Sequence, residues 1–180
     1  MNIIKKSKKQ LRKISMADEV SFVEGQAEDA QGIVQLIQKL ESETTSIEFD
    51  DAISKSSLER IGENLNLIQQ SPLNFLLIAK LGETPIGIVT LIETDEVKHR
   101  AELGVGVLKD YWHNGIGTML VDEALYWAKQ FSWLEQVWLA VLDNNQYAIQ
   151  IYQNLGFQTK TPPTMDGQGR QIIKMELSLT

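Results

Sequence analysis

The chain has 180 residues, of which 43% are hydrophobic, and its formal net charge is −7. This length supports one domain with a sizeable core and is short for two. The absence of cysteine excludes disulfides, a thiol nucleophile and a thiolate metal site, and two histidines are too few for a His-rich metal centre. No apolar run reaches the roughly 20 residues of a membrane helix. The N-terminus also lacks the apolar middle of a secretory signal, so we expect a cytoplasmic protein.

Residues 1–16 form a basic extension ahead of the first predicted element. They contain six basic side chains and no acidic one. We interpret them as a solvated, disordered extension and not as a nucleic-acid arm, because no aromatic residues interleave with the lysines. The remainder, residues 17–180, is predicted to be one domain. Its acidic balance repels nucleic acid and favours cationic partners.

The first part of the domain predicts a strand, two amphipathic helices and a two-stranded hairpin. The helices are indicated by apolar residues spaced three and four apart, and the hairpin by two β-like runs that flank a turn at Gly82–Pro85. In chain order these elements are Val20–Glu24, Asp29–Leu40, Ser57–Gln70, Phe75–Ala79 and Ile86–Ile92.

The second part begins with a predicted strand, Arg100–Leu108, that contains Gly104 and Gly106. A glycine inside a strand often marks a bulge or a place where something approaches the backbone. The remaining predicted elements alternate between helix and strand and end with two strands: Gly115–Phe131, Gln136–Leu142, Asn145–Leu155, Phe157–Lys160 and Gln171–Leu179. This order predicts a mixed α/β fold built on a single sheet.

A glycine-containing turn lies between the predicted strand Arg100–Leu108 and the long helix, at Tyr111–Thr118 with the sequence YWHNGIGT. Glycines let a ligand approach free backbone N–H groups, and the start of the helix adds unsatisfied donors and a positive dipole end. Such a site suits a pyrophosphate. A plain glycine turn before a core helix is the alternative.

The segment Asn145–Phe157 carries a second pattern, NQYAIQIYQNLGF. Asn145 suits a helix N-cap, and Gly156 suits a C-cap. Tyr152 follows Asn145 by seven residues and lies on roughly the same helix face, where a half-buried aromatic with no further role is the alternative.

Together these features resemble the GNAT N-acetyltransferase superfamily. The phosphate loop of that family, R/Q-x-x-G-x-G/A, corresponds to Trp112–Gly117, and its signature N-x-x-A-x-x-x-Y-x-x-x-G-F corresponds to Asn145–Phe157 without a gap. The resemblance covers residues 20–180 and is tightest over 102–157. It implies a single, mixed, mostly antiparallel sheet that splays at the cofactor strand and is flanked by about four helices.

One position departs from the family pattern. Trp112 stands where the family has Arg or Gln, and Trp supplies no charge to a phosphate. We therefore expect weaker phosphate binding there or compensation by Lys109. A Rossmann-type nucleotide site is disfavoured, because Leu120 stands at the third glycine of G-x-G-x-x-G.

The resemblance implies acetyl-CoA as co-substrate, no metal, and direct attack of a primary amine in a ternary complex. It assigns Tyr152 as the acid, Glu102 as the candidate base, and the amide of Val105 or a close neighbour as the oxyanion donor. Glu93 is the alternative base, and a surface carboxylate is the alternative reading of Glu102. The residues expected to bind the cofactor are Val105, Val107, Leu108, Lys109, Asn114, Gly115, Ile116, Gly117, Thr118, Asn145 and Tyr152.

The acceptor is the open question, and a small-molecule amine and a peptide amine both fit. A group of acids is compatible with a cationic acceptor such as a polyamine, and a solvated acidic face is the alternative: Glu41, Glu43, Glu48, Asp50 and Asp51. A homodimer agrees with the family habit. The alternative function is a non-catalytic acyl-CoA sensor with the same fold.

Overall fold

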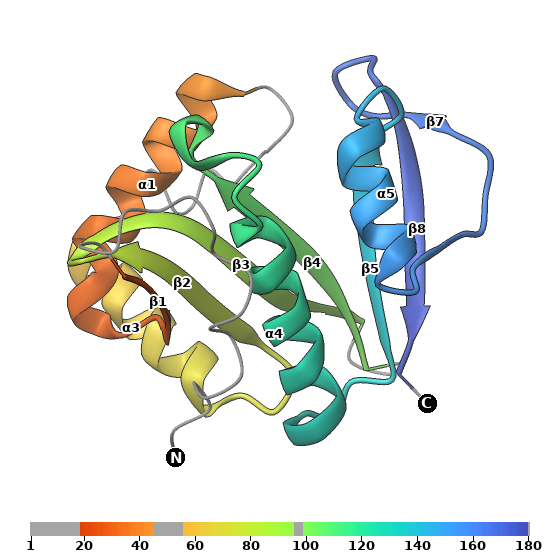
Figure 1. Cartoon of the computed structure of the whole chain (residues 1–180). Coiled ribbons are helices and arrows are strands. Elements are labelled where there is room, and N and C mark those ends of the chain that lie inside the picture. The colour runs from red at the N-terminus through yellow and green to blue at the C-terminus, as the bar shows by residue number, and fades with distance from the viewer. Residues whose placement is uncertain (1–18, 45–55, 96–98, 180) are drawn as a thin grey trace.

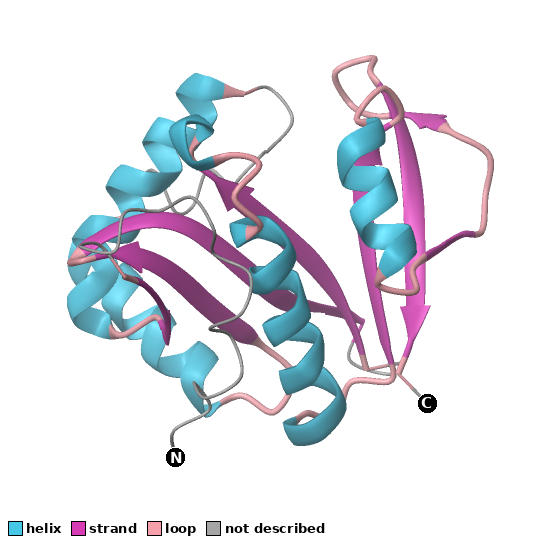
Figure 2. Ribbon diagram, in the orientation of Figure 1, coloured by secondary structure: helices cyan, strands magenta, loops and turns pink. Residues whose placement is uncertain are grey.

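The computed structural model describes residues 19–44, 56–95 and 99–179. Within them, one eight-stranded sheet has the order β1-β2-β3-β4-β5-β8-β6, and β7 pairs with β8 off this path. Figures 1 and 2 show this sheet with helices packed against it. The strands are β1 (Val20–Glu24), β2 (Phe75–Leu81), β3 (Thr84–Asp95), β4 (Arg100–Val107), β5 (Gln136–Leu142), β6 (Gln158–Thr159), β7 (Thr164–Met165) and β8 (Gln171–Ser178).

Four α-helices flank the sheet in the described ranges. They are α1 (Ala30–Glu43), α3 (Leu58–Gln70), α4 (Ile116–Phe131) and α5 (Gln146–Asn154), and two short 3-10 helices, η1 (Ala27–Asp29) and η2 (Lys109–Tyr111), connect elements. The hydroxyl of Ser57 caps α3, and the side chain of Asn145 caps α5. The predicted mixed α/β fold is confirmed.

The helices lie on opposite faces of the sheet. Phe75 of β2 stacks on Trp127 of α4, with ring centroids 4.7 Å apart. Ile78 of β2 instead lies with Ile33 of α1 around Gly25. Because side chains alternate along a strand, residues 75 and 78 point to opposite faces. We call the two sides the α4 face and the α1 face.

The sheet opens between β4 and β5. These strands pair in parallel only over Arg100–Glu102 and Gln136–Trp138, and then diverge. Beyond that point β4 still pairs with β3, and β5 still pairs with β8. The gap between the two halves is visible in Figure 1, where α4 and α5 flank it. The splayed sheet that the resemblance implied is therefore present.

Several boundaries differ from the sequence-based expectation. Helix α1 continues to Glu43, and β6 is shorter than predicted at Gln158–Thr159. Strand β7 lies in a stretch that we expected to be loop. A turn closed by hydrogen bonds of Asp166 with Gly169 and Arg170 folds it back onto β8. The expected extension at residues 1–16, and the acids Glu48, Asp50 and Asp51, lie outside the described residues.

Candidate active site

The gap between β4 and β5 contains a cavity of about 540 Å³. Its walls come from β4, the turn before α4, the first turn of α4, β5, α5 and the β7–β8 turn. Most of the predicted cofactor residues line it, together with Glu102: Val105, Val107, Gly115, Ile116, Gly117, Thr118, Asn145 and Tyr152. Leu108, Lys109 and Asn114 lie outside this lining.

Strand β4 presents backbone groups to the cavity. The backbone N–H of Leu108 donates to the carbonyl of Ile86 at 2.9 Å and therefore points toward β3. The carbonyl of Val107 instead accepts from the indole Nε1 of Trp112 at 2.7 Å. Backbone groups of successive residues alternate between the two edges of an antiparallel strand. By this alternation, the N–H and C=O of Val105 point, like those of Val107, away from β3 and toward the gap.

The first turn of α4 forms the end of the cavity. Gly115, its N-cap, has φ 80° and ψ 0°, a left-handed conformation that glycine adopts without strain. The first intrahelical bond runs from the amide of Met119 to the carbonyl of Gly115 at 3.0 Å. The amides of residues 116–118 therefore precede the helical hydrogen-bond ladder, and no acidic residue lies in this turn. Such a turn suits an anion.

Asn114 shapes the turn from outside the cavity lining. Its Nδ2 donates to the carbonyls of Tyr111 and Trp112, at 3.2 and 3.1 Å. These bonds hold the backbone that precedes Gly115. Asn114 thus stabilises the turn, and its expected contact with the cofactor stays a prediction.

Trp112 stands where the family has Arg or Gln, and Lys109 is the residue expected to supply the phosphate with a charged donor in its place. The indole N–H of Trp112 is bonded to Val107, and 43% of the residue is exposed. The backbone amide of Lys109 donates to Glu43 Oε2 at 2.7 Å, and Lys109 is not in the cavity lining. This placement gives no support to compensation by Lys109. Among the described lining residues, Arg170 and His113 have side chains that can carry positive charge.

Arg170 and His113 were not predicted from the sequence. Arg170 pairs with Asp166 through an Nε–Oδ2 distance of 2.6 Å. Backbone hydrogen bonding from Arg170, more than any other cause, lowers the pKa of Asp166. His113 has φ 61°, and its ring lies edge-on to Tyr147, with centroids 5.0 Å apart. The pair joins the turn before α4 to the first turn of α5, a contact that no local spacing in the sequence signals.

Tyr152 lies on the wall formed by α5. The residue is 9% exposed, and its ring packs edge-on to Phe157 with centroids 5.9 Å apart. Burial raises the pKa of Tyr152 to about 12. The phenol therefore stays protonated over the whole range in which an enzyme operates. Asn145 begins the same helix, and its Oδ1 accepts from the amide of Ala148 at 3.2 Å.

Glu102 and Glu93 lie on opposite faces of the sheet. Glu102 pairs in register with Ile92, whereas Glu93 pairs with Ala101 and shares the α4 face with Leu91. Glu102 lines the cavity and Glu93 does not. Burial raises the pKa of Glu102, and the charge of Lys174 opposes this by a smaller amount. A carboxylate with a raised pKa at the cavity wall suits a general base.

The comparisons with known proteins identify the family of the chain. The model of the acetyltransferase (GNAT) family matches residues 34–157. The chain therefore belongs to the GNAT acetyltransferase family, as the sequence motifs indicated. A GNAT acetyltransferase from Streptococcus pneumoniae has a TM-score of 0.80 and 26% identity, covering 89% of this chain and 99% of that chain.

Other matches are a relative with a named activity and structures solved with a coenzyme. The spermidine N(1)-acetyltransferase of Escherichia coli K12 is 30% identical over 93 residues, so the chain spans about half the length of the curated relatives it matches, and 49% of this chain is covered. The Salmonella typhimurium protein yncA, solved with acetyl-CoA, has a TM-score of 0.73 at 15% identity, covering 90% of this chain and 95% of that chain. Vibrio cholerae spermidine N-acetyltransferase, solved with CoA and spermine, has a TM-score of 0.67 at 17% identity, covering 89% and 95%.

Residues 19–44, 56–95 and 99–179 contain neither a metal-binding cluster nor a membrane-spanning helix. No group of three or more His, Asp or Glu side chains there could hold a metal ion. No helix in the same ranges combines the length and the hydropathy that crossing a bilayer requires.

Proposed function

We propose that this protein transfers an acetyl group from acetyl-CoA to the primary amine of a small molecule or peptide, by direct attack in a ternary complex. The observation that carries the proposal is the cavity in the splayed sheet, which joins free amides of α4, the exposed edge of β4, and Tyr152. A phosphorylated carrier with an amide-containing arm fits such walls. The phosphate end fits the α4 turn, and the arm can pair with a strand edge. A cytoplasmic location, expected from the sequence, and a homodimer, expected from the family, belong to the proposal.

Two side chains and one backbone amide have roles in the proposed transfer. Glu102 accepts the proton of the attacking amine, directly or through water, because an alkylammonium has a pKa of about 10 and is not a nucleophile. The Val105 amide donates to the oxygen that becomes negative as the N–C bond forms. Tyr152 donates its phenolic proton to the sulfur as the C–S bond breaks. The products are the N-acetylated amine and a free thiol.

Positioning carries much of the proposed rate. Holding an amine against a thioester in the right orientation can supply several kcal/mol of a barrier without any one essential side chain. The cavity is lined from both faces of the sheet, by α4 and α5 on one face and by Glu102 on the other. We therefore expect the two substrates to approach the gap from opposite sides.

A coupled assay tests this function. Release of free thiol from acetyl-CoA is measured with a panel of amines and peptides, and coenzyme binding is measured separately by calorimetry. Binding with amine-dependent thiol release is the expected result. Binding without turnover for any acceptor would favour the acyl-CoA sensor, and absence of binding would contradict both functions.

A further inference from the structure

The α1 face beside Glu102 carries a row of side chains across three strands. In the register of the sheet, Ile92 of β3 pairs with Glu102 of β4, and Glu102 pairs with Trp138 of β5. Ile92 is 39% exposed, and Trp138 is partly exposed. The row therefore presents apolar surface on both sides of the candidate base.

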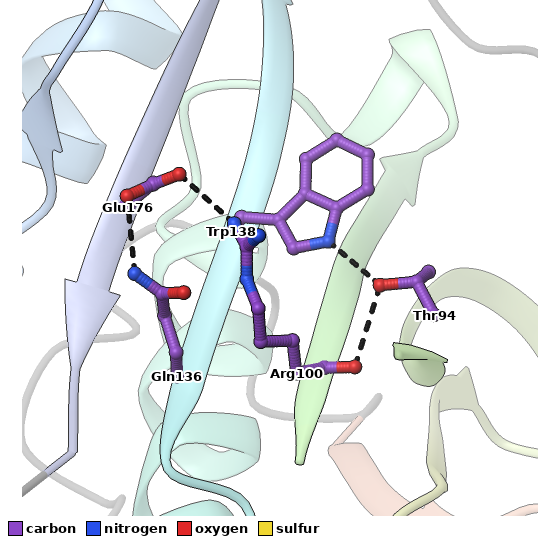
Figure 3. A network of polar contacts seen from close by, with 5 residues as sticks. All are labelled: Thr94, Arg100, Gln136, Trp138 and Glu176. Atoms are coloured by element: carbon purple, nitrogen blue, oxygen red, sulfur yellow. Dashed lines mark hydrogen bonds and ion pairs between the residues drawn. The ribbon is translucent and has the colours of Figure 1, made fainter. Parts of the chain in front are cut away.

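Trp138 of this row belongs to a network of polar contacts that Figure 3 shows, together with Thr94, Arg100, Gln136 and Glu176. Glu176 accepts from Arg100 Nη2 at 2.9 Å and from Gln136 Nε2 at 3.0 Å. Trp138 Nε1 donates to Thr94 Oγ1 at 3.0 Å, and that hydroxyl donates to the carbonyl of Arg100 at 3.3 Å. This network fixes the indole plane of Trp138 and uses the charges of Arg100 and Glu176 within the sheet.

Lys174 adds a positive charge directly beside the row. It pairs in register with Ala140, a residue of the cavity lining, and its Nζ lies 5.3 Å from the centroid of the Trp138 ring. Lys174 is exposed. An ammonium over an aromatic ring occupies the position that a cationic ligand would take there. A second ammonium on an acceptor would meet the charge of Lys174, whereas a carboxylate would be attracted to it.

The acids at the end of α1 are the competing recognition element. Glu43 Oε2 accepts from the backbone amide of Lys109 at 2.7 Å, and Glu43 Oε1 lies 3.8 Å from Lys39 Nζ. The charge of Glu43 is thus partly offset within the protein, which weakens the case for a polycation at this edge of the site.

We propose that Glu102, Lys174, Trp138 and Ile92 select an α-amino acid with an apolar side chain as the acceptor. Its amine faces Glu102, its carboxylate faces Lys174, and its side chain lies on Trp138 and Ile92. The inference rests on the proposed acetyl transfer and names its substrate class. Glu102 takes the proton of the amine, the N–C bond forms while the thioester C–S bond breaks, and the products are an N-acetylamino acid and free thiol.

The test compares acceptors that differ by one charge. Thiol release is measured with L-phenylalanine, L-phenylalaninamide and spermidine for the wild-type chain, Lys174→Gln and Lys174→Glu. Lys129→Gln, in the last turn of α4, is the matched control for loss of one exposed lysine. The readout is the ratio of kcat/KM for phenylalanine to that for the amide. Comparing this ratio between variants cancels the different amine pKa values of the two substrates.

In the wild-type chain, kcat/KM for phenylalanine is expected to exceed kcat/KM for spermidine. Lys174→Gln should lower the acid-to-amide ratio about fivefold to tenfold, mainly through KM, because the lost contact binds ground state and transition state alike. Lys174→Glu should invert the preference for phenylalanine over phenylalaninamide, and Lys129→Gln should leave the acid-to-amide ratio unchanged.

Two results overturn the inference: an acid-to-amide ratio unaffected by Lys174→Gln, or wild-type preference for spermidine. In both cases acetyl transfer itself is observed, so the proposed function survives. A chain that binds no coenzyme in calorimetry overturns the proposed function, and the acceptor inference then falls with it.

Discussion

Tyr152 and Glu102 carry the chemistry of the proposed site, and they differ in how far the sequence predicted them. The pattern of Asn145–Phe157 located Tyr152, because one helix face fixes its direction relative to the cap. The assignment of Glu102 as the base rested on its place in a predicted strand. The face of the sheet on which Glu102 lies follows only from its register with Ile92 and Trp138. Arg170 was missed because it reaches the cavity from the turn before β8, outside both motifs. His113 lies in the predicted turn, but its contact with Tyr147 of α5 depends on the fold. The spacing of residues in the sequence does not predict contacts between such separate segments.

Tyr152→Phe tests the assigned acid. Removing the phenolic hydroxyl while keeping the ring should lower kcat about 100-fold, within the range that general acid catalysis contributes. The packing against Phe157 depends on the ring and is retained, so calorimetry should show a coenzyme Kd within about threefold of the wild type. A rate equal to that of the wild type would remove Tyr152 from the mechanism.

Glu102→Gln tests the candidate base through its pH dependence. Since the base must be ionised, we expect kcat/KM of the wild type to fall as pH decreases through the raised pKa of Glu102. The glutamine variant should lack this acidic limb and be slower by about 100-fold or more at pH 8. The same acidic limb in both proteins would assign the titration to another group.

The same substitution makes a stability prediction of definite sign. Burial raises the folded-state pKa of Glu102 above its unfolded value, so the folded protein binds the proton more tightly. Stability from this group is present below the unfolded pKa and is lost as pH rises through the folded pKa. Glu102→Gln should therefore raise Tm relative to the wild type at pH 8 and have a smaller effect at pH 4. Thermal unfolding at the two pH values measures the difference, and an equal shift at both contradicts the assignment.

At the scale of elements, the α4 turn was predictable for a local reason, because its glycines precede a long amphipathic helix. The splay of the sheet followed instead from the family resemblance, because it depends on where β4 and β5 stop pairing. Strand β7 could not be predicted, because Thr164–Met165 is too short for a periodic pattern and depends on the turn at Asp166. The sequence indicates that Trp112 supplies no charged donor to a phosphate. In the structure its indole N–H donates to the carbonyl of Val107.

Gly115→Ala separates backbone strain from crowding in the α4 turn. A Cβ at Gly115 meets no atom within 4 Å, but the residue has φ +80°. The left-handed conformation costs a non-glycine residue about 1–2 kcal/mol, which for a chain of this size lowers Tm by roughly 2–8 °C. Coenzyme binding should weaken with it.

Gly167→Ala is the matched control. A Cβ there also meets no atom within 4 Å, and its φ lies outside the left-handed range. Alanine at such a position should be neutral or slightly stabilising, by up to about 1 kcal/mol. Equal losses of Tm in the two variants would show that the turn before α4 owes nothing to the conformation of Gly115.

On the scale of the whole molecule, the divergence of β4 from β5 divides the sheet into two halves that share one cavity. One half carries α1, α3 and α4, and the other carries α5 with β5 and β8. A ligand that spans the gap contacts both halves and should stabilise the folded chain by RT ln(1 + [L]/Kd), about 2.7 kcal/mol at 100 times Kd. The family and the fold followed from two motifs and the element order, whereas the acceptor depends on side chains that meet across three strands.

Titration calorimetry with acetyl-CoA, paired with thermal unfolding at saturating coenzyme, tests the central claim most directly. The cavity between β4 and β5 predicts saturable binding of one coenzyme per chain, a higher Tm, and binding at least about tenfold weaker for S-acetylpantetheine, which lacks the phosphates held by the α4 turn. The absence of both heat and thermal protection would contradict the account.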